Sequence, residues 1–349
     1  MEKLWSVRKY TKEDKELLFK LYEEVWGKEI AQVCRKRWDW KFEDNPNNPK
    51  EGPFIRILEY KGQLAGFICG ISTKVLINTK TYQAYWLVDH MTHPKYRGRG
   101  HLLIKKAYEE NPLNIGFPTE PAYLLWKRIA GFDVHISFNP LMKKSVNLEN
   151  TVTKFVKNKL IPKFITLPLN LLSDLIFKPK KSPLITLTQI SSFNSRIDDF
   201  WNRISKNFNA ISIRDMKYLN WRFVRCPDVQ YTIFLAEKKK EISGYIVLRV
   251  YQNTGYIVDF LAEKEGFESL IWRATKYFKE QKVNSICCLE PKNAFYLKTL
   301  KKCGFFVRKG STVYRYIGRS IIPDVPMEFL REPKNWFLTL GDSDLDMII

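Results

Sequence analysis

The feature that most limits the possible folds of this chain lies in residues 86–101, which read WLVDHMTHPKYRGRGH. The apolar and aromatic residues up to Thr92 suit a buried strand, and Pro94 ends that strand because proline has no N–H for a β-ladder. From His101 onward the apolar residues recur at the spacing of a helix. The glycines between the two elements therefore stand at the N-terminus of a helix.

The turn itself, Arg97-Gly98-Arg99-Gly100, is suited to binding a phosphate or pyrophosphate. Unshielded backbone N–H groups and the positive end of the helix dipole meet there, and two arginines add positive charge. Turns of glycine and arginine are also common as solvent-exposed connections, so the flanking residues have to decide.

With its flanks, the turn resembles motif A of the GNAT superfamily of N-acetyltransferases, written Arg/Gln-x-x-Gly-x-Gly/Ala. Arg97 takes the first position and Gly100 the fourth, whereas Leu102 stands where the family prefers glycine or alanine. The resemblance implies an acetyl-CoA site and a reaction that needs no metal. Two groups of residues would hold the cofactor: Met91, Thr92 and His93 the pantetheine arm, and Arg97, Gly98, Arg99, Gly100, His101 and Leu102 the pyrophosphate.

The second half of the chain repeats the first. The segments that recur include Trp40-Lys41-Phe42 as Trp221-Arg222-Phe223, and Leu87-Val88-Asp89 as Ile257-Val258-Asp259. We therefore expect an α+β fold of two tandem GNAT-like domains, each a twisted mixed sheet flanked by helices, in residues 1–145 and 184–349. In place of the glycine turn, residues 263–269 hold three carboxylates and no arginine, so only the first domain is expected to bind acetyl-CoA.

A basic, apolar linker is expected at residues 146–183. Within it, residues 153–181 mix leucine and isoleucine with lysine, as does a segment that lies on an anionic membrane. Its prolines break a continuous amphipathic face and favour the alternative of a linker packed on the domains.

Composition bounds the remaining properties. The formal net charge of +21 implies attraction to anions, but it does not choose among CoA phosphates, nucleic acid and membrane; nucleic acid is not expected as a partner, and the oligomeric state stays open. No apolar run is long enough to span a membrane and no signal peptide is visible, which favours the cytoplasm. The six cysteines lack CxxC spacing and the four histidines are scattered, so we expect neither disulfides nor a metal site.

Acyl transfer to an amine needs groups that handle protons. His90 shares a strand face with the positions where the family often places its base, and an ordinary pKa of about 6.5 suits that role. Asp89 is the alternative base, weakened because it recurs in the copy without the glycine turn; a proton relayed by solvent is the third option. Tyr123 is the nearest phenol for an acid or else a packing residue, and Glu120 either attracts an amine or caps a helix.

The sequence thus predicts an acetyl-CoA-dependent N-acetyltransferase that acts on the primary amine of a small-molecule or polymer-borne acceptor. Two alternatives remain. One is an aminoacyl-tRNA-dependent transferase like the Fem family, which also has tandem GNAT folds but does not rely on a motif A turn. The other is a non-catalytic protein that binds anionic surfaces through its lysines.

Overall fold

The contacts of the computed structural model, which describes residues 4–129, 135–146 and 176–347, divide the chain into two compact units. Each unit is assembled from three separate stretches of sequence, unlike the continuous ranges expected from the repeat. Unit 1 consists of Met1–Phe138, Asn209–Val229 and Arg315–Asn335, and unit 2 of Asn139–Phe208, Gln230–Tyr314 and Trp336–Ile349. Most of the predicted linker, including the larger part of residues 153–181, lies outside the described residues.

Unit 1 is built on a mixed sheet with the strand order β1-β2-β3-β4-β5-β14. The strands are β1 (Trp5–Lys9), β2 (Phe54–Tyr60), β3 (Gln63–Ile77), β4 (Lys80–Thr92), β5 (Leu113–Gly116) and β14 (Val313–Ser320). β4 and β5 run parallel, and the other neighbours run antiparallel. A short strand, β8 (Ala210–Ser212), pairs with the end of β3.

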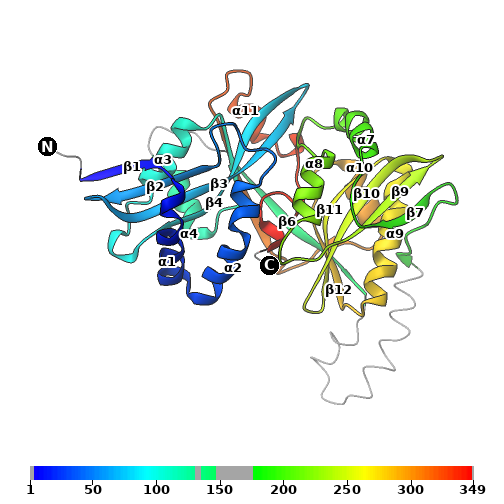
Figure 1. The fold of residues 1–349 in the computed structure, drawn as a ribbon. Coiled ribbons are helices and arrows are strands. Elements are labelled where there is room, and N and C mark those ends of the chain that lie inside the picture. The colour runs from blue at the N-terminus through cyan, green and yellow to red at the C-terminus, as the bar shows by residue number, and fades with distance from the viewer. Residues whose placement is uncertain (1–3, 130–134, 147–175, 348–349) are drawn as a thin grey trace, which may run out of the picture. The chain divides into compact units, whose positions relative to one another are not determined.

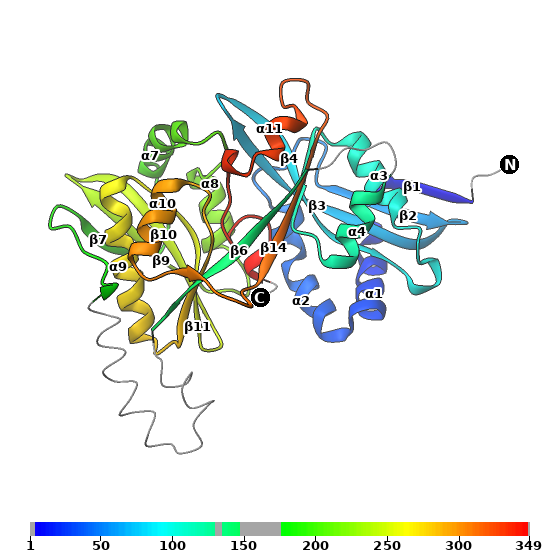
Figure 2. The same cartoon turned by 180° about the vertical axis from the view of Figure 1, so that it is seen from behind.

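Helices cover both faces of this sheet. In Figure 1, α1 (Lys15–Trp26) and α2 (Lys28–Trp38) lie in front of it; in Figure 2, seen from behind, α3 (His101–Glu110) and α4 (Glu120–Arg128) do. A π-helical turn, η2 (Asp39–Glu43), extends α2, and a 3-10 turn, η3 (Pro94–Tyr96), follows β4. Unit 1 also contains α8 (Met216–Leu219), the π-helical turn η5 (Asn220–Val224) and α11 (Met327–Arg331).

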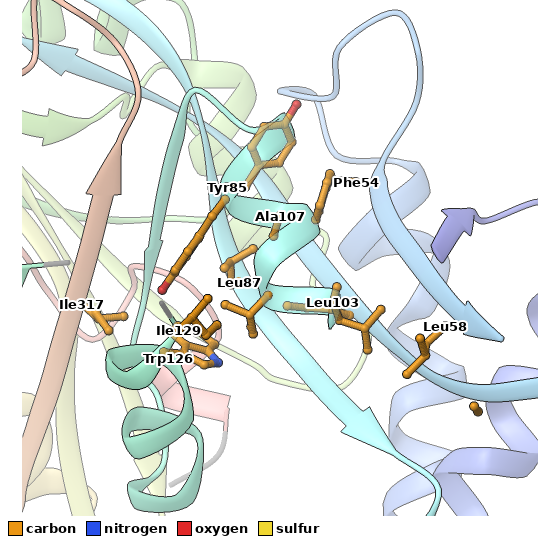
Figure 3. Close-up of a cluster of buried hydrophobic side chains, with 13 residues drawn as sticks. Phe54, Leu58, Tyr85, Leu87, Leu103, Ala107, Trp126, Ile129 and Ile317 are labelled. Carbon is orange, nitrogen blue, oxygen red and sulfur yellow. The ribbon is translucent and has the colours of Figure 1, made fainter. Parts of the chain in front are cut away.

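Apolar side chains of α3 and α4 close one face of the sheet over a core drawn in Figure 3. The spacing of Leu103, Ile104, Ala107 and Tyr108 turns one side of α3 toward the strands, and all four are buried. From α4 and the residue after it, Trp126 and Ile129 join this core. The sheet contributes seven side chains: Phe54, Leu58, Ala65, Ile68, Tyr85, Leu87 and Ile317. This core fixes α3, and therefore the turn that precedes it, against β4.

Unit 2 repeats the pattern with the strand order β6-β12-β11-β10-β9-β7. The strands are β6 (His135–Ser145), β7 (Thr186–Ile190), β9 (Thr232–Lys238), β10 (Glu241–Tyr251), β11 (Thr254–Ala262) and β12 (Ser285–Leu289), and the main helices are α7 (Arg196–Ile204), α9 (Lys264–Glu280) and α10 (Ala294–Lys302). β11 and β12 are its parallel pair. The predicted α+β class, with two tandem mixed sheets flanked by helices, is confirmed.

Each sheet takes one strand from the other half of the sequence. In unit 1 the partner of β5 is the segment Ile317–Ser320 of β14. In unit 2 the partner of β12 is the segment Leu141–Ser145 of β6. This exchange explains why the units are discontinuous. Each half of the sequence supplies a strand to the sheet of the other half, and that strand pairs with the second strand of the parallel pair there. Within the described residues, no helix combines the length and the apolar character that crossing a membrane requires.

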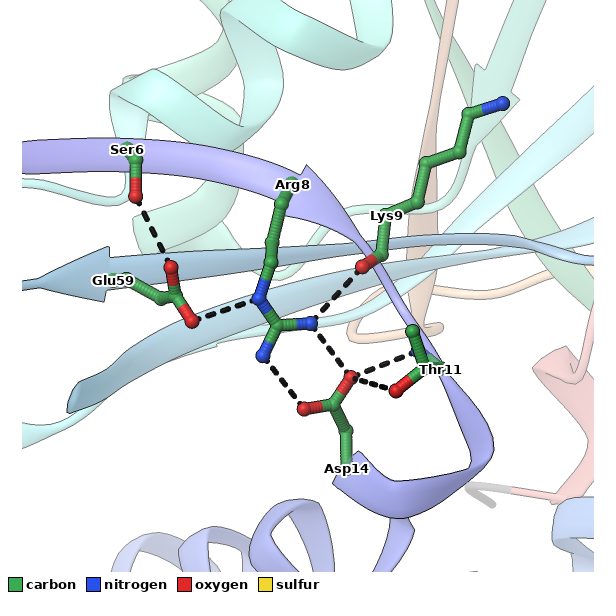
Figure 4. Close-up of polar contacts among 6 residues, drawn as sticks. All are labelled: Ser6, Arg8, Lys9, Thr11, Asp14 and Glu59. Atoms are coloured by element: carbon green, nitrogen blue, oxygen red, sulfur yellow. Dashed lines mark hydrogen bonds and ion pairs between the residues drawn. The ribbon is translucent and has the colours of Figure 1, made fainter. Parts of the chain in front are cut away.

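Polar contacts anchor the N-terminal edge of unit 1 (Figure 4). The Arg8 guanidinium of β1 donates to Glu59 of β2 at 2.7 Å and to both carboxylate oxygens of Asp14 at 2.7 Å. Asp14 also accepts from the backbone N–H of Thr11 at 2.8 Å, which caps the start of the first helix. Arg8 thereby lowers the pKa of the Asp14 carboxyl. One arginine links two strands and a helix.

We expect Asp14→Asn to lower the free energy of unfolding by about 1–2 kcal/mol, because it removes the charge from a part-buried bidentate pair in which only 8% of the Asp14 side chain is exposed. Urea denaturation measures the loss. Glu16→Gln is the matched control, because it breaks an ion pair with Arg35 whose side chains are both more than half exposed, and it should cost less than about 0.5 kcal/mol. Equal losses in the two variants would contradict the anchoring role of Asp14.

Candidate active site

The two parallel strands of unit 1 part soon after they meet. β4 pairs with β5 only through Tyr85 and Trp86. Beyond Trp86, the edge of β4 that faces β5 has no strand partner among the described residues, as far as Thr92. Backbone N–H and C=O groups on such an edge are free to pair with an extended ligand that carries amides.

A β-bulge lies in this open part of β4. Met91 pairs with Phe67 of β3 and Val88 pairs with Cys69, so two residues of β4, Asp89 and His90, stand opposite one residue of β3. Asp89 has a φ of 50°, in the left-handed region that residues with a side chain rarely adopt.

An ion pair holds this bulge. The Asp89 carboxylate lies 2.9 Å from Nζ of Lys41, and only 12% and 9% of the two side chains are exposed. Lys41 comes from the π-helical turn η2, between Trp40 and Phe42, which are both buried. Because the left-handed conformation costs free energy, a buried partner is what keeps Asp89 in place. The carboxylate of this candidate base is therefore engaged by a cation.

The glycine turn keeps several backbone donors free. Gly98 has a φ of 87°, which glycine adopts without strain. In this fully described loop, the N–H groups of Gly98, Gly100 and His101 donate to no backbone carbonyl, while Arg99 and Leu102 donate to carbonyls within the turn. His101 Nδ1 lies 2.7 Å from the Gly98 carbonyl oxygen and steadies the turn. The free N–H groups, with the exposed side chains of Arg97 and Arg99, suit an anion.

His90 connects the bulge to this turn. Its Nε2 lies 3.0 Å from the carbonyl oxygen of Gly100 and donates to it, which places the proton of the neutral ring on Nε2. A Cβ at Gly100 would lie 2.9 Å from the same nitrogen, so only glycine allows the close approach. Burial lowers the pKa of His90 to about 4, partly opposed by the bond to Gly100. The ring is therefore neutral at pH 7 and supports the turn.

The other predicted cofactor residues continue from the open edge into the turn. Met91 and Thr92 are the last residues of β4, and Met91 is buried. His93 caps η3: its Nδ1 accepts from the backbone N–H of Lys95 at 3.1 Å, and its Nε2 lies 3.2 Å from the Glu24 carboxylate. The chain thus leads directly from a strand edge that can pair with amides to a turn that can bind phosphate.

Glu120 and Tyr123 lie together at the start of α4, and both contact Arg315 of β14. The Arg315 guanidinium forms an ion pair with the Glu120 carboxylate and lies 5.1 Å from the centre of the Tyr123 ring. The negative charge of Glu120 is therefore matched within unit 1. No contact joins these two residues to Asp89 or His90 in the described part of the chain.

The histidines lie on different elements: His90 on β4, His93 at the start of η3, His101 at the start of α3 and His135 on β6. The described residues contain no group of three or more histidine, cysteine, aspartate or glutamate side chains placed to hold a metal ion. All six cysteines, each within the described residues, are free thiols.

In unit 2, the strand that corresponds to β4 ends differently. At the end of β11, the Tyr296 hydroxyl donates to the carbonyl oxygen of Ala262 at 2.6 Å and accepts from its N–H at 3.1 Å. One buried phenol therefore satisfies both backbone groups of that residue. A cavity of about 480 Å³ beside it is lined in part by Glu263 and Glu265, at the start of α9.

Two residues of this region were not predicted from the sequence. In the sequence, Lys41 stands out only as part of the repeated Trp-Lys/Arg-Phe segment. A cation between two aromatic residues is a signal for a buried ion pair. Arg315 lies almost 200 residues from Glu120 along the chain, and no local pattern connects them.

Comparison with known proteins agrees with this geometry. A family model described as acetyltransferase (GNAT) domain matches residues 6–124, and no curated protein matches the sequence. The fold resembles a protein of Enterococcus faecalis V583 described as a probable N-acyltransferase (TM-score 0.63, 14% identity, 91% of this chain and 73% of that one). It also resembles a GCN5-related N-acetyltransferase from Anabaena variabilis (TM-score 0.62, 12% identity, 90% and 72%) and Saccharomyces cerevisiae N-myristoyltransferase with bound myristoyl-CoA (TM-score 0.52, 13% identity, 92% and 80%).

Residues 6–124, within unit 1, match the GNAT acetyltransferase domain. The parted parallel strands and the open turn lie within this matched segment. The family predicted from the turn and the repeat is confirmed.

We expect the neutral, partly buried His90 to make the stability of the protein depend on pH. Its pKa is lowered from 6.5 to about 4, so the unfolded chain binds the extra proton first and stability falls as the pH drops from 6.5 toward 4. The contribution at pH 5 should be roughly 1–2 kcal/mol. Urea midpoints at pH 7.5 and 5 for the wild type and His90→Gln test this; an unchanged pH dependence in the variant would contradict it.

The Lys41–Asp89 pair is expected to behave as a coupled unit. Lys41→Met should cost about 3–5 kcal/mol of stability, because it leaves a carboxylate nearly buried without its partner. Adding Asp89→Asn should recover part of that loss, since asparagine tolerates the left-handed backbone and carries no charge. A double-mutant cycle in urea gives the coupling, and strictly additive losses would count against it.

Proposed function

We propose that unit 1 transfers an acetyl group from acetyl-CoA to the primary amine of a small-molecule or polymer-borne acceptor. The observation that carries this proposal is the order of free backbone groups along the chain. The open edge of β4 ends at Thr92, and the turn with free N–H groups follows at residues 97–102. Coenzyme A presents an amide-bearing arm and then a pyrophosphate in the same order.

In this arrangement the pantetheine amides pair with the edge of β4 near Met91 and Thr92. The pyrophosphate binds the N–H groups of Gly98, Gly100 and His101, and Arg97 and Arg99 neutralise its charge. The N–H of Leu102 donates to the carbonyl oxygen of Arg99, so it is not available to the pyrophosphate. The phosphate site therefore depends on residues 97–101.

The chemical step is a direct attack of the unprotonated amine on the thioester carbonyl. A new C–N bond forms, the C–S bond breaks and the thiolate of CoA leaves, taking up a proton. A backbone N–H at the open end of β4 stabilises the oxyanion of the tetrahedral intermediate.

The contacts of the candidate catalytic residues favour water as the carrier of the amine's proton. Asp89 is held by Lys41, and Glu120 by Arg315. His90 donates through Nε2 to the turn, and with a pKa of about 4 it is a weak base at neutral pH. We therefore assign Asp89 and His90 to holding the cofactor site, Glu120 to positioning Arg315, and Tyr123 to packing beneath that guanidinium.

Unit 2 is proposed to lack a cofactor. The Tyr296 hydroxyl occupies the backbone groups at the end of β11 that would pair with pantetheine, and Glu263 and Glu265 replace the arginines of the turn.

Isothermal titration with CoA and acetyl-CoA tests the cofactor site. The wild type should bind both, and Arg97→Glu should weaken binding at least about tenfold, since it replaces a charge that meets the pyrophosphate with an opposing one. Lys36→Glu makes the same charge reversal on an exposed lysine of α2 and should leave the affinity within about twofold. Absence of CoA binding in the wild type would refute the proposal, and salt-dependent tRNA binding in its place would favour the Fem-like alternative.

A further inference from the structure

Three aromatic rings fill the point where β4 and β5 part. Trp86, on the last paired residue of β4, stacks on Phe117, just beyond β5, with ring centres 5.4 Å apart and planes 6° from parallel. Tyr316 of β14 contacts both rings, with centres 6.1 Å from Trp86 and 5.7 Å from Phe117. Trp86 and Tyr316 are fully buried, at 1% and 0% exposure. We call these three residues the ring wall.

The other face of the same point is closed as well. Gly116, the last residue of β5, packs so tightly on Trp126 that a Cβ there would lie 2.9 Å from the indole. Trp126 is buried in the core between α3, α4 and the sheet, as Figure 3 shows. The strands therefore part from a closed end, with aromatic rings on both faces of the sheet.

The length of the open edge determines where the thioester of a bound donor lies relative to the ring wall. Because of the bulge, residues 87–92 lie opposite residues 66–70 of β3, so the open edge spans roughly 14 Å, on the order of the length of an extended pantetheine arm. With the pyrophosphate at the turn, the thioester end of the donor reaches the closed end, beside Trp86. An acyl chain that continues beyond the thioester meets packed rings.

Trp86 acts there through its shape. Its indole N–H is buried and has no hydrogen-bond partner among the described residues, so no polar contact in the described chain accounts for a tryptophan at this position. A buried donor without a partner costs free energy, which the packing of the large ring has to offset.

We propose that the ring wall of Trp86, Phe117 and Tyr316 limits the donor to short acyl chains and excludes medium and long ones. This inference rests on the proposed acyl-CoA site of unit 1. It assigns a specificity-determining role to three residues, one of which lies in the exchanged strand β14.

The test is titration of CoA, acetyl-CoA, butyryl-CoA and octanoyl-CoA into the wild type and two variants, Trp86→Ala and Trp86→Phe. In the wild type, octanoyl-CoA should bind at least about tenfold more weakly than acetyl-CoA, because its chain has to displace well-packed rings. Trp86→Ala should bring the two affinities within about threefold, since the space left by the indole admits apolar chain. Trp86→Phe keeps a ring and should retain most of the discrimination.

Control variants distinguish a failure to fold from a failure of the ring-wall proposal and from a failure of the proposed cofactor site. Trp26→Ala removes a partly exposed tryptophan of α1, outside the closed end, and should leave the chain-length preference unchanged. If Trp86→Ala does not fold, as circular dichroism and thermal melting will show, Phe117→Ala replaces it with the same expected relaxation. Equal affinity of the wild type for acetyl-CoA and octanoyl-CoA would overturn the ring wall and leave the proposed cofactor site standing. Failure of CoA itself to bind would overturn both.

Discussion

The strand β4 of unit 1 pairs with β5 only at Tyr85 and Trp86, and the surrounding structure is arranged around the open edge that follows. β3 pairs with β4 on its other side, and the bulge at Asp89 is fixed by Lys41 from a different element. His90 extends the same support to the turn that follows. Unpaired backbone is tolerated in folded proteins where a ligand or solvent completes it, so these supports keep open an edge that would otherwise collapse or pair.

Much of this arrangement could be predicted from sequence, because it depends on local patterns. A buried strand, a proline stop, glycines and a helical spacing follow one another within residues 86–107, so the turn and its place before α3 were predictable. The recurrence of Trp40-Lys41-Phe42 as Trp221-Arg222-Phe223 indicated two similar folds. The absence of arginine in residues 263–269 distinguishes the two copies, because the charge of a segment follows directly from its residue types.

The contacts that joined distant segments could not be predicted in this way. The residues of a strand do not indicate which sheet the strand will join, so the pairing of β14 with β5 could not be predicted. The ion pair of Arg315 with Glu120 could not be predicted for the same reason. The alternation of side chains along β4 places His90 on the strand face where the family often has its base, but the bulge shifts the register and the carbonyl oxygen of Gly100 accepts from the ring. The contact of the Tyr296 hydroxyl at the end of β11 depends on the approach of α10, a helix that begins 32 residues after that strand ends.

The exchanged strand also dictates an order of events during synthesis. The sheet of unit 1 is complete only when residues 317–320 have reached β5, although the glycine turn and the open edge of β4 are made long before. Until then the outer edge of β5 lacks its partner and is exposed to pairing with other chains. A ribosome that has translated the entire family-matched segment, residues 6–124, has thus not yet made a finished domain, and a fragment cut there would lack one of its strands.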